Sequence, residues 1–257
     1  MEKFWPFILP LALALVGFAM LWPLSVRRKD ASIVDLLWGP GFFAQLAIAA
    51  GIVGLSGARD WVLLGLIGLW SLRLGFVIAR RAGAHPGEDP RYRILRRAWG
   101  AAFWWKSLFV VFLLQAFVQW VIVIGPVAGL AFGAGPLGAM GWFGLVVACV
   151  GLGIEALADA QLDRFKRMAG NGALCTTGLR AHVRHPNYLG EMIFWTGIGL
   201  VVLDGGVLLG LLSPLVVGFF LVFVSGVPML DEHLSVSRDG YSAYRERVPA
   251  LLPRLRK

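Results

Sequence analysis

Residues 208–229 read LLGLLSPLVVGFFLVFVSGVPM, a run without a charged side chain. An α-helix needs about 20 apolar residues to cross the hydrocarbon core of a bilayer, and this run is long enough. Its apolar residues are continuous rather than alternating, which excludes the strand pattern of a membrane β-barrel. Only helices and closed barrels satisfy their backbone hydrogen bonds in lipid. The stretch therefore predicts an all-α integral membrane protein.

The composition of the whole chain agrees with this interpretation. Of its 257 residues 58% are hydrophobic and 15% are charged, and the mean hydropathy is +0.73. A soluble domain carries roughly 25% charged residues. We expect residues 1–257 to form a single membrane domain of seven helices. The expected spans are residues 5–25, 33–56, 61–79, 103–125, 137–160, 188–206 and 208–229, and the fourth could extend towards residue 132.

The basic residues predict the orientation of these spans. With seven spans, 20 of the 24 lysines and arginines lie at one set of helix ends, and only Lys3 and Arg59 lie on the opposite side. The positive-inside rule then places the N-terminus outside and the C-terminus in the cytoplasm. We expect a multi-pass protein of the cell inner (cytoplasmic) membrane, with cytoplasmic loops at 80–102 and 164–187 and a short cytoplasmic helix within 231–257.

Anchoring in the membrane accounts for most of the net charge of +9. Because no soluble domain carries a basic face, we expect no nucleic-acid partner. The two cysteines, Cys149 and Cys175, are isolated in the sequence. They predict neither a disulfide nor a metal site.

A polar motif precedes the sixth expected span and reads RHPNYLGE, residues 184–191. Its proline, Pro186, fits the first turn of a helix. Asn187 and Glu191 are four residues apart and share one helical face. The motif also offers Arg184 and His185 to a phosphate or carboxylate, and it follows a Gly-rich loop whose backbone N–H groups could hold phosphates. The motif, with Tyr188, therefore predicts a nucleotide-like ligand.

Charged residues within or at the ends of other spans have two interpretations each. Glu155 and Asp159 are four residues apart, and they form either a solvated helix end or a polar site facing the bundle interior. Arg73 either extends to the membrane interface or points inward at an anion. Asp35 is either a carboxylate favoured by a helix dipole or a polar group at the floor of a pocket. The sequence Gly39-Pro40-Gly41 would kink the helix and make room for a ligand.

Two further segments add polar residues on the cytoplasmic side. The segment from Arg80 to Arg93 combines charges of both signs with turn-forming residues, and its length indicates a cap over a site. It contributes Arg81 and Arg91. The C-terminal tail predicts a short amphipathic helix with its tyrosines on one face. The tail residues of interest are Asp231, Glu232, Tyr241 and Tyr244.

Together these motifs resemble the steroid 5α-reductase family, in a bacterial membrane branch that carries a domain of unknown function. The likeness to its C-terminal domain lies in Glu155 and Asp159, in residues 178–191 and in the tail from Asp231 to Tyr244. The segments Asp35–Gly39 and His85–Tyr92 resemble the bacterial branch. The resemblance covers the chain from about residue 30 onward. It implies a seven-helix bundle that binds NADPH from the cytoplasm. It also implies hydride transfer to an activated C=C of a hydrophobic, lipid- or steroid-like substrate that enters from the bilayer.

The resemblance also implies roles for single residues. By position, Arg73, Glu155, Asp159, Asn187 and Glu191 match residues around the nucleotide. Charge and location add Arg81, Arg91, Arg184 and His185. The motif and the tail add Tyr188, Asp231, Glu232, Tyr241 and Tyr244.

The chain departs from the family where the substrate carbonyl is held. The reductases use a Gln-Glu pair and a Tyr, and here Asp35 stands at the Glu and Trp70 at the Tyr. Tryptophan cannot act as a general acid near neutral pH. We therefore expect Asp35 to be the catalytic residue, which requires that burial keeps it protonated.

Two other functions remain open. The Arg-His-Pro-x-Tyr pattern is shared with isoprenylcysteine carboxyl methyltransferases. The main alternative is therefore an S-adenosylmethionine-dependent membrane methyltransferase that uses the same helix start and Glu232. The seven expected spans and the His85–Tyr92 segment count against it. A third interpretation is a non-catalytic lipid-binding membrane protein. The sequence leaves the oligomeric state and the substrate open.

Overall fold

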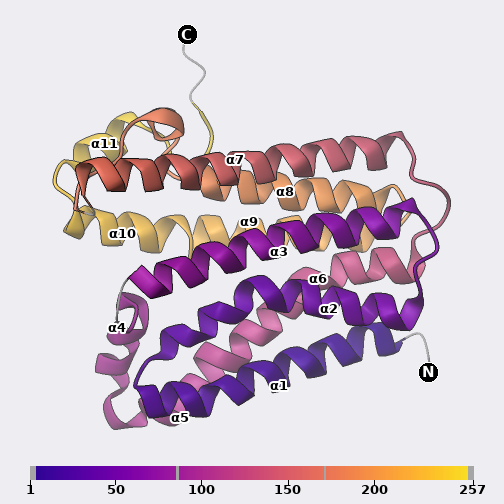
Figure 1. The fold of residues 1–257 in the computed structure, drawn as a ribbon, viewed down its shortest axis with the longest axis horizontal. Helices are drawn as coiled ribbons and strands as arrows, with labels where there is room; N and C mark the ends of the chain where they lie inside the picture. Colours follow the sequence, from indigo (N-terminus) through magenta and orange to yellow (C-terminus); the bar gives the residue numbers. More distant parts are fainter. Residues whose placement is uncertain (1–3, 85–86, 171, 254–257) are drawn as a thin grey trace.

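The computed structural model describes residues 4–84, 87–170 and 172–253. Within these ranges every regular element is a helix, as the apolar runs predicted (Figure 1). Six helical segments are long and apolar enough to cross a membrane, which confirms an all-α protein built from membrane-spanning helices. These segments are Trp5–Arg28, Ala31–Val53, Ala58–Gly83, Pro90–Phe132, Ala139–Ala169 and Leu208–Ser237.

The second expected span is made of two kinds of helix. A 3-10 helix, η2 (Ala31–Leu37), leads into α2 (Trp38–Val53) directly before the Gly-Pro-Gly sequence. The carboxylate of Asp30 caps η2 by accepting a hydrogen bond of 2.9 Å from the Ser32 N–H. The glycine at 39 serves packing rather than space, since a Cβ there would lie 2.5 Å from the backbone nitrogen of Gly75. The sequence thus predicted the place of the irregularity but not its form.

Helices replace most of the expected loop at residues 80–102. The third span, α3 (Ala58–Ala84), continues beyond residue 80, and α4 (Pro90–Trp99) follows. Asp89 caps α4 by accepting a hydrogen bond of 2.9 Å from the Arg91 N–H. Figure 1 shows α4 crossing one end of the bundle, transverse to the long helices. The chain then passes through η3 (Gly100–Ala102), α5 (Phe103–Ser107) and the π-helix η4 (Leu108–Leu113) into α6 (Leu114–Phe132).

The C-terminal half is built around two long helices in close contact. α7 (Ala139–Ala169) and α8 (Pro186–Leu203) lie side by side in Figure 1. Small residues form their seam: a Cβ at Gly151 would lie 2.3 Å from the Phe194 backbone nitrogen, and one at Gly197 the same distance from that of Ala148. Helices in membranes associate closely along such small residues. The first turns of α8 carry polar side chains, and α8 is not among the six segments above.

The chain returns along α8 through short helices. These are η6 (Leu208–Leu211), α9 (Leu212–Phe219), the π-helix η7 (Phe220–Val224), α10 (Val227–Ser237) and α11 (Tyr241–Arg247). Between α7 and α8 lies the 3-10 helix η5 (Gly178–Ala181). In Figure 1, α4, α10, α11 and the ends of α3 and α7 all lie at the same end of the bundle. The polar residues of the sequence motifs are therefore gathered at one end.

An aromatic cluster fills the core between α2, α3 and α8. Trp70 is 1% exposed and stacks on Phe194, with ring centroids 5.6 Å apart. Phe42 and Trp195 meet the same indole edge-on, at 5.1 and 5.2 Å. Trp70, for which the resemblance suggested the position of a substrate-binding tyrosine, is thus a core side chain.

A buried ion pair closes the opposite end of the bundle. Arg59 lies 2.9 Å from Asp204, and it also donates to backbone oxygens of the loop before α7. Burial alone would raise the pKa of Asp204, but hydrogen bonds from the Gly138 N–H and from Arg59 hold it below its ordinary value. The pair ties α3, α8 and this loop together.

Candidate functional site

A half-buried arginine joins α3 to α7 inside the bundle. The guanidinium of Arg73 makes an ion pair with Glu155 and another with Asp159. These carboxylates are 2% and 8% exposed. A charge within an apolar bundle is costly unless it is paired. Arg73 therefore points inward and is held between two carboxylates, rather than extending to the interface.

This pairing leaves neighbouring polar atoms without partners. Within the described residues, Nε of Arg73, Oε1 of Glu155 and Nε1 of Trp70 are buried and have no partner at full hydrogen-bond geometry, although the Trp70 indole and the Glu155 carboxylate are near enough to interact. An unsatisfied buried polar atom costs roughly 1–3 kcal/mol. Trp70 lies about one helical turn before Arg73 on α3, so these atoms belong to one region. A bound group carrying both donors and acceptors would be stabilised there.

The first turns of α8 border this region. Glu191 lies within electrostatic range of Arg73 and Asp159, and the backbone of its neighbour Gly190 packs against the Glu155 side chain. Glu191 and Asn187 are half-buried, and no other described residue forms a hydrogen bond or ion pair with either side chain. Of the two residues predicted to share a face, Glu191 therefore lies near Arg73. We call Trp70, Arg73, Glu155, Asp159 and Glu191 the inner polar cluster.

Cations gather beside the inner polar cluster, near the ends of α3 and α7. Arg81 lies 3.3 Å from Oδ1 of Asp159, and Arg180 in η5 donates to the carbonyl oxygen of Ala158 at 3.0 Å. Lys166 is half-buried and within electrostatic range of both arginines. Burial lowers the pKa of Arg180, and the charge of Arg81 lowers it further. An anion would relieve this repulsion, so the cation cluster of Arg81, Lys166 and Arg180 suits a phosphate.

The Arg184-His185 pair holds the C-terminal helices. Nη2 of Arg184 and Nε2 of His185 each lie 2.7 Å from a carboxylate oxygen of Asp231 in α10. The hydroxyl of Tyr241 donates to the same buried carboxylate. Four residues that the sequence predicted around a cofactor therefore bind one another. They leave few free polar atoms for a ligand.

Backbone hydrogen bonds reinforce this connection. The N–H groups of Arg184 and His185 donate to the carbonyl oxygens of Pro249 and Ala250, at 2.9 and 3.0 Å. The chain after α11 is thereby fastened to the segment that leads into α8. We call these bonds, with the four side chains above, the tail clasp.

The predicted site residues in and around the tail clasp differ in their surroundings. Burial lowers the pKa of His185 despite its bond to Asp231, so its imidazole is neutral near pH 7. Burial also raises the pKa of Tyr244 to about 12, and its hydroxyl donates to the Arg180 carbonyl at 2.6 Å. Tyr188 stacks on His185 with ring centroids 5.5 Å apart. Glu232, by contrast, is exposed on α10.

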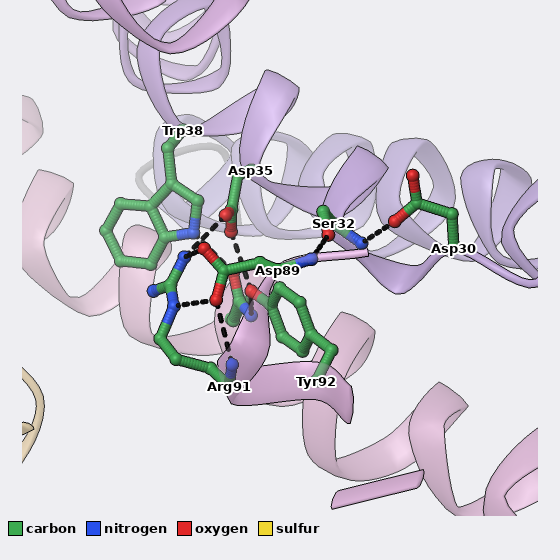
Figure 2. Close-up of polar contacts among 8 residues, drawn as sticks. Asp30, Ser32, Asp35, Trp38, Asp89, Arg91 and Tyr92 are labelled. Carbon is green, nitrogen blue, oxygen red and sulfur yellow. Dashed lines mark hydrogen bonds and ion pairs between the residues drawn. The ribbon is translucent and has the colours of Figure 1, made fainter. Parts of the chain in front are cut away.

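A second polar cluster lies where α4 meets η2 (Figure 2). The hydroxyl of Tyr92 donates to Oδ1 of Asp35 at 2.7 Å, and Nη2 of Arg91 lies 2.8 Å from Oδ2. Arg91 also makes an ion pair with Asp89. The backbone N–H of Asp89 donates a hydrogen bond to the Ser32 hydroxyl at 2.6 Å. Asp35 is therefore not a bare helix-dipole carboxylate, because two side chains of α4 hold it.

Amide side chains of α6 complete this Asp35 cluster. Gln115 donates to the Tyr92 hydroxyl at 3.2 Å and accepts a hydrogen bond from the Trp38 indole. One turn further along α6, Gln119 accepts a hydrogen bond of 2.8 Å from the buried Gln45. Glutamine, carboxylate and phenol thus occur together beside the apolar core.

The tyrosine of this cluster was not assigned a role from the sequence. Tyr92 stood in the His85–Tyr92 segment, which was interpreted as a loop. The sequence Asp89-Pro90, an N-cap followed by a proline at the first helical position, was the signal for α4. The first two residues of that segment, His85 and Pro86, lie outside the described ranges.

Tyr188 on α8 connects the cation cluster with the Asp35 cluster. It lies within electrostatic range of Arg81, which belongs to the cation cluster, and of Arg91, which belongs to the Asp35 cluster. Asp89 is likewise within range of His233 on α10. Helices α3, α4, α8 and α10 therefore surround a common region.

An apolar cavity of about 260 Å³ opens between α2 and α3. It is lined by Pro40, Phe43, Ser71, Leu72, Gly75 and Phe76. Leu72 and Phe76 are well exposed, which places the opening on the outer surface of the bundle. Pro40 of the Gly-Pro-Gly sequence thus forms part of the cavity wall. Among the described residues, no group of three or more His, Cys, Asp or Glu side chains is placed to hold a metal ion.

Comparison with known proteins gives one family and one relative. A family model described as "Protein of unknown function (DUF1295)" matches residues 21–248. An uncharacterized protein of Schizosaccharomyces pombe is 28% identical over 279 residues, covering 97% of this chain and 80% of that protein. No solved structure matches the chain.

Proposed function

The chain belongs to the DUF1295 family of proteins of unknown function, and we propose that it is an NADPH-dependent membrane reductase of the steroid 5α-reductase type. The reaction would be hydride transfer to an activated C=C of a hydrophobic, lipid- or steroid-like substrate. The observation that carries this proposal is the inner polar cluster. Its buried donors and acceptors lack partners, and a cation cluster stands beside it.

The proposal includes a topology. α8 would be the seventh span, with the N-terminus outside, the C-terminus in the cytoplasm and the protein in the inner membrane. Most basic segments lie at the end of the bundle that carries α4, α10 and α11, which is the pattern of a cytoplasmic face (Figure 1). α8 packs along α7 over most of its length, so its polar first turns are covered by protein rather than by lipid.

The residues present fit a dinucleotide. Arg81, Lys166 and Arg180 would hold its phosphates. The carboxylates of Glu155 and Glu191 would accept hydrogen bonds from ribose hydroxyls or from a carboxamide. When bound, the cofactor supplies the hydride, while the protein supplies orientation and a water-poor environment.

The Asp35 cluster would supply the proton. The single phenol proton of Tyr92, which is donated to Asp35 in the structure, would turn to a substrate carbonyl at this position and be transferred as negative charge develops on the carbonyl oxygen. The hydride and this proton together give an enol, which becomes the saturated ketone when the proton moves from the oxygen to the α-carbon. Asp35 would hold the phenol before the substrate binds, Gln115 would orient it throughout, and Arg91 would stabilise the phenolate that remains. Asp35 is thus proposed as a catalytic-site residue that acts together with Tyr92.

The substrate would come from the bilayer. The cavity beside Pro40 is apolar and opens between α2 and α3, and α2 continues directly from η2, which carries Asp35. A hydrophobic molecule could therefore reach the Asp35 cluster without crossing water.

Ligand-dependent thermal stability tests this proposal. Detergent-purified protein is heated alone, with NADPH and with S-adenosylmethionine. NADPH at about 100 times its Kd should stabilise the protein by roughly 2.7 kcal/mol. Stabilisation by S-adenosylmethionine alone would replace the reductase with a methyltransferase. No response to either ligand would leave a non-catalytic lipid-binding protein.

A further inference from the structure

Helix α4 has two faces with different surroundings. On the face towards the bundle, Tyr92 reaches Asp35, and Arg96 makes a two-bond contact with Glu88 at 2.7 and 2.8 Å. Arg93 and Arg97 are turned away from this face and are exposed. They are four residues apart and so lie one above the other on the helix. Neither forms an ion pair with any described residue, and Arg93 interacts with Glu88 only at a distance.

The direction of α4 differs from that of the spans. It crosses the end of the bundle transverse to α1, α3 and α7 (Figure 1). If those helices cross a bilayer, α4 lies in the plane of the membrane. Its exposed side also carries Ile94, which is 65% exposed and directly follows Arg93. An exposed isoleucine beside cations is typical of a helix lying at a membrane surface.

Tryptophans next to α4 mark the level of the membrane interface. Trp104 and Trp105 on α5 are 56% and 45% exposed. The ammonium of Lys106 lies 5.9 Å from the Trp99 ring and 5.8 Å from the Trp105 ring. Tryptophan is enriched at the headgroup level of bilayers. The indole of Trp22 donates to the Trp104 carbonyl oxygen at 2.8 Å, which fixes this level relative to α1.

More cations lie at the end of α1. Arg27, Arg28 and Lys29 are exposed there. The chain directly after them is joined to the segment before α4, because the Ala31 N–H donates to Glu88 at 2.9 Å. The end of α1 and the outer face of α4 thus form one basic surface beside the tryptophans.

We propose that α4 is a membrane-surface helix that binds the phosphates of anionic phospholipid headgroups through Arg93 and Arg97. Ile94, beside them on the exposed side of the helix, enters the boundary of the acyl chains, and Arg27, Arg28 and Lys29 extend the surface. The inner face of the same helix carries Arg91 and Tyr92. Lipid binding therefore holds the helix that completes the Asp35 cluster. This inference rests on the geometry of α4 and does not depend on the reaction proposed above.

If the exposed cations served only positive-inside anchoring, each of them would contribute equally to the binding of anionic lipid. The structure offers a matched pair for this comparison, because Arg164 and Arg167 on α7 are also exposed and also form no ion pair with a described residue. The α4 pair differs in having an exposed isoleucine and neighbouring tryptophans. The double substitution Arg93→Gln/Arg97→Gln can therefore be compared with Arg164→Gln/Arg167→Gln.

The experiment measures lipid retention and thermal stability in a neutral detergent. Phosphatidylglycerol or phosphatidylcholine is added at equal mole fraction, and inorganic phosphate serves as a soluble probe. Phosphatidylglycerol should raise the unfolding midpoint of the wild type and of the α7 variant. The α4 variant should bind it about 25-fold more weakly, since each arginine near the surface contributes about fivefold. Arg93→Lys/Arg97→Lys should restore most of the binding, because lysine still binds phosphate as a point charge.

Three results would overturn the proposal. The α4 variant could respond to phosphatidylglycerol like the wild type, the α7 variant could lose the response equally, or inorganic phosphate could reproduce it. If the glutamine variant cannot be purified, salt provides a second test on the unmodified protein. Raising the ionic strength should abolish the difference between the two lipids, since exposed charges are screened. An unchanged difference in high salt would contradict binding through arginines.

Discussion

The phenol of Tyr92 lies 2.7 Å from the carboxylate of Asp35, although 57 residues separate them in the chain. The bond connects α4, which crosses the end of the bundle, to the 3-10 helix that begins the second span. It places a proton donor beside the carboxylate at which the sequence predicted catalysis. The resemblance placed Trp70 where the reductases have a tyrosine, and Tyr92 is a tyrosine of a different helix that contacts Asp35.

Replacing Tyr92 with phenylalanine removes this donor while keeping the ring in its packed position. If Tyr92 delivers the proton, Tyr92→Phe should lower kcat by about 100-fold or more, the usual contribution of a general acid. NADPH affinity should be unchanged. The assay follows NADPH absorbance with a 4-ene-3-oxo steroid as the probe substrate, and a thermal shift reports NADPH binding.

Tyr244→Phe is the control for this substitution. Its hydroxyl donates to a backbone oxygen of η5 rather than to Asp35. The control should lose some stability but keep its kcat. Equal turnover in the Tyr92 variant and the wild type would remove Tyr92 from the reaction.

Substitutions of Glu191 and Glu232 compare a carboxylate in the candidate site with one on the surface. Glu191 borders the inner polar cluster without a hydrogen-bond partner among the described residues, and Glu232 is exposed on α10. A hydrogen bond to a charged group contributes about 1.5–3 kcal/mol. Glu191→Gln should therefore weaken NADPH binding by about tenfold or more, and Glu232→Gln should leave it unchanged. Isothermal titration measures both, and equal affinities would exclude Glu191 from the site.

The seam between α7 and α8 makes a prediction about stability. A Cβ at Gly151 would lie 2.3 Å from a backbone atom of α8, whereas one at Gly153 would meet nothing within 4 Å. Gly151→Ala should destabilise the protein by roughly 1–3 kcal/mol, the usual cost of overpacking. Gly153→Ala should be neutral or slightly stabilising, because alanine favours helix over glycine. Thermal unfolding in detergent compares them, and similar midpoints would show that the helices can separate at little cost.

The neutral imidazole in the tail clasp predicts how stability depends on pH. Burial lowers the pKa of His185 below the ordinary 6.5, so the unfolded chain binds more protons between the two values. The stabilising contribution is therefore complete above about pH 6.5 and is lost as the pH falls through the pKa of the folded state. The unfolding midpoint should decrease over this range.

His185→Gln should lower stability at neutral pH and reduce this pH dependence. His233→Gln is the matched control, since that histidine is exposed on the neighbouring α10. Its pH profile should follow the wild type. A steep pH dependence that persists in the His185 variant would assign it to other groups.

Local patterns predicted much of this architecture. Continuous apolar runs such as 208–229 predicted the helices, because a run of this kind can satisfy its backbone hydrogen bonds in lipid only as a helix. The spacing of Glu155 and Asp159 predicted a shared face, and both indeed contact Arg73. The tail pattern predicted that Tyr241 and Tyr244 lie on one face, and both are buried.

Pairings between distant residues could not be predicted in this way. Asp231 was interpreted as a cofactor ligand, but its carboxylate binds Arg184 and His185, 47 and 46 residues earlier. The residues next to an acidic side chain in the sequence do not determine whether it binds a ligand or a distant part of the same chain. The α4 segment was interpreted as a loop because turn-forming residues precede it, although Asp89 and Pro90 were signals of a helix start.

The tail clasp has a consequence for the order in which the protein is made. Arg184 and His185 leave the ribosome well before Asp231, Tyr241 and the carbonyl groups of residues 249 and 250 to which they bind. During membrane insertion the start of α8 therefore has no binding partner from the tail. Its closing contact forms only after residue 250 has been synthesised. The last helices to emerge thus finish the end of the bundle that the earlier helices had left open.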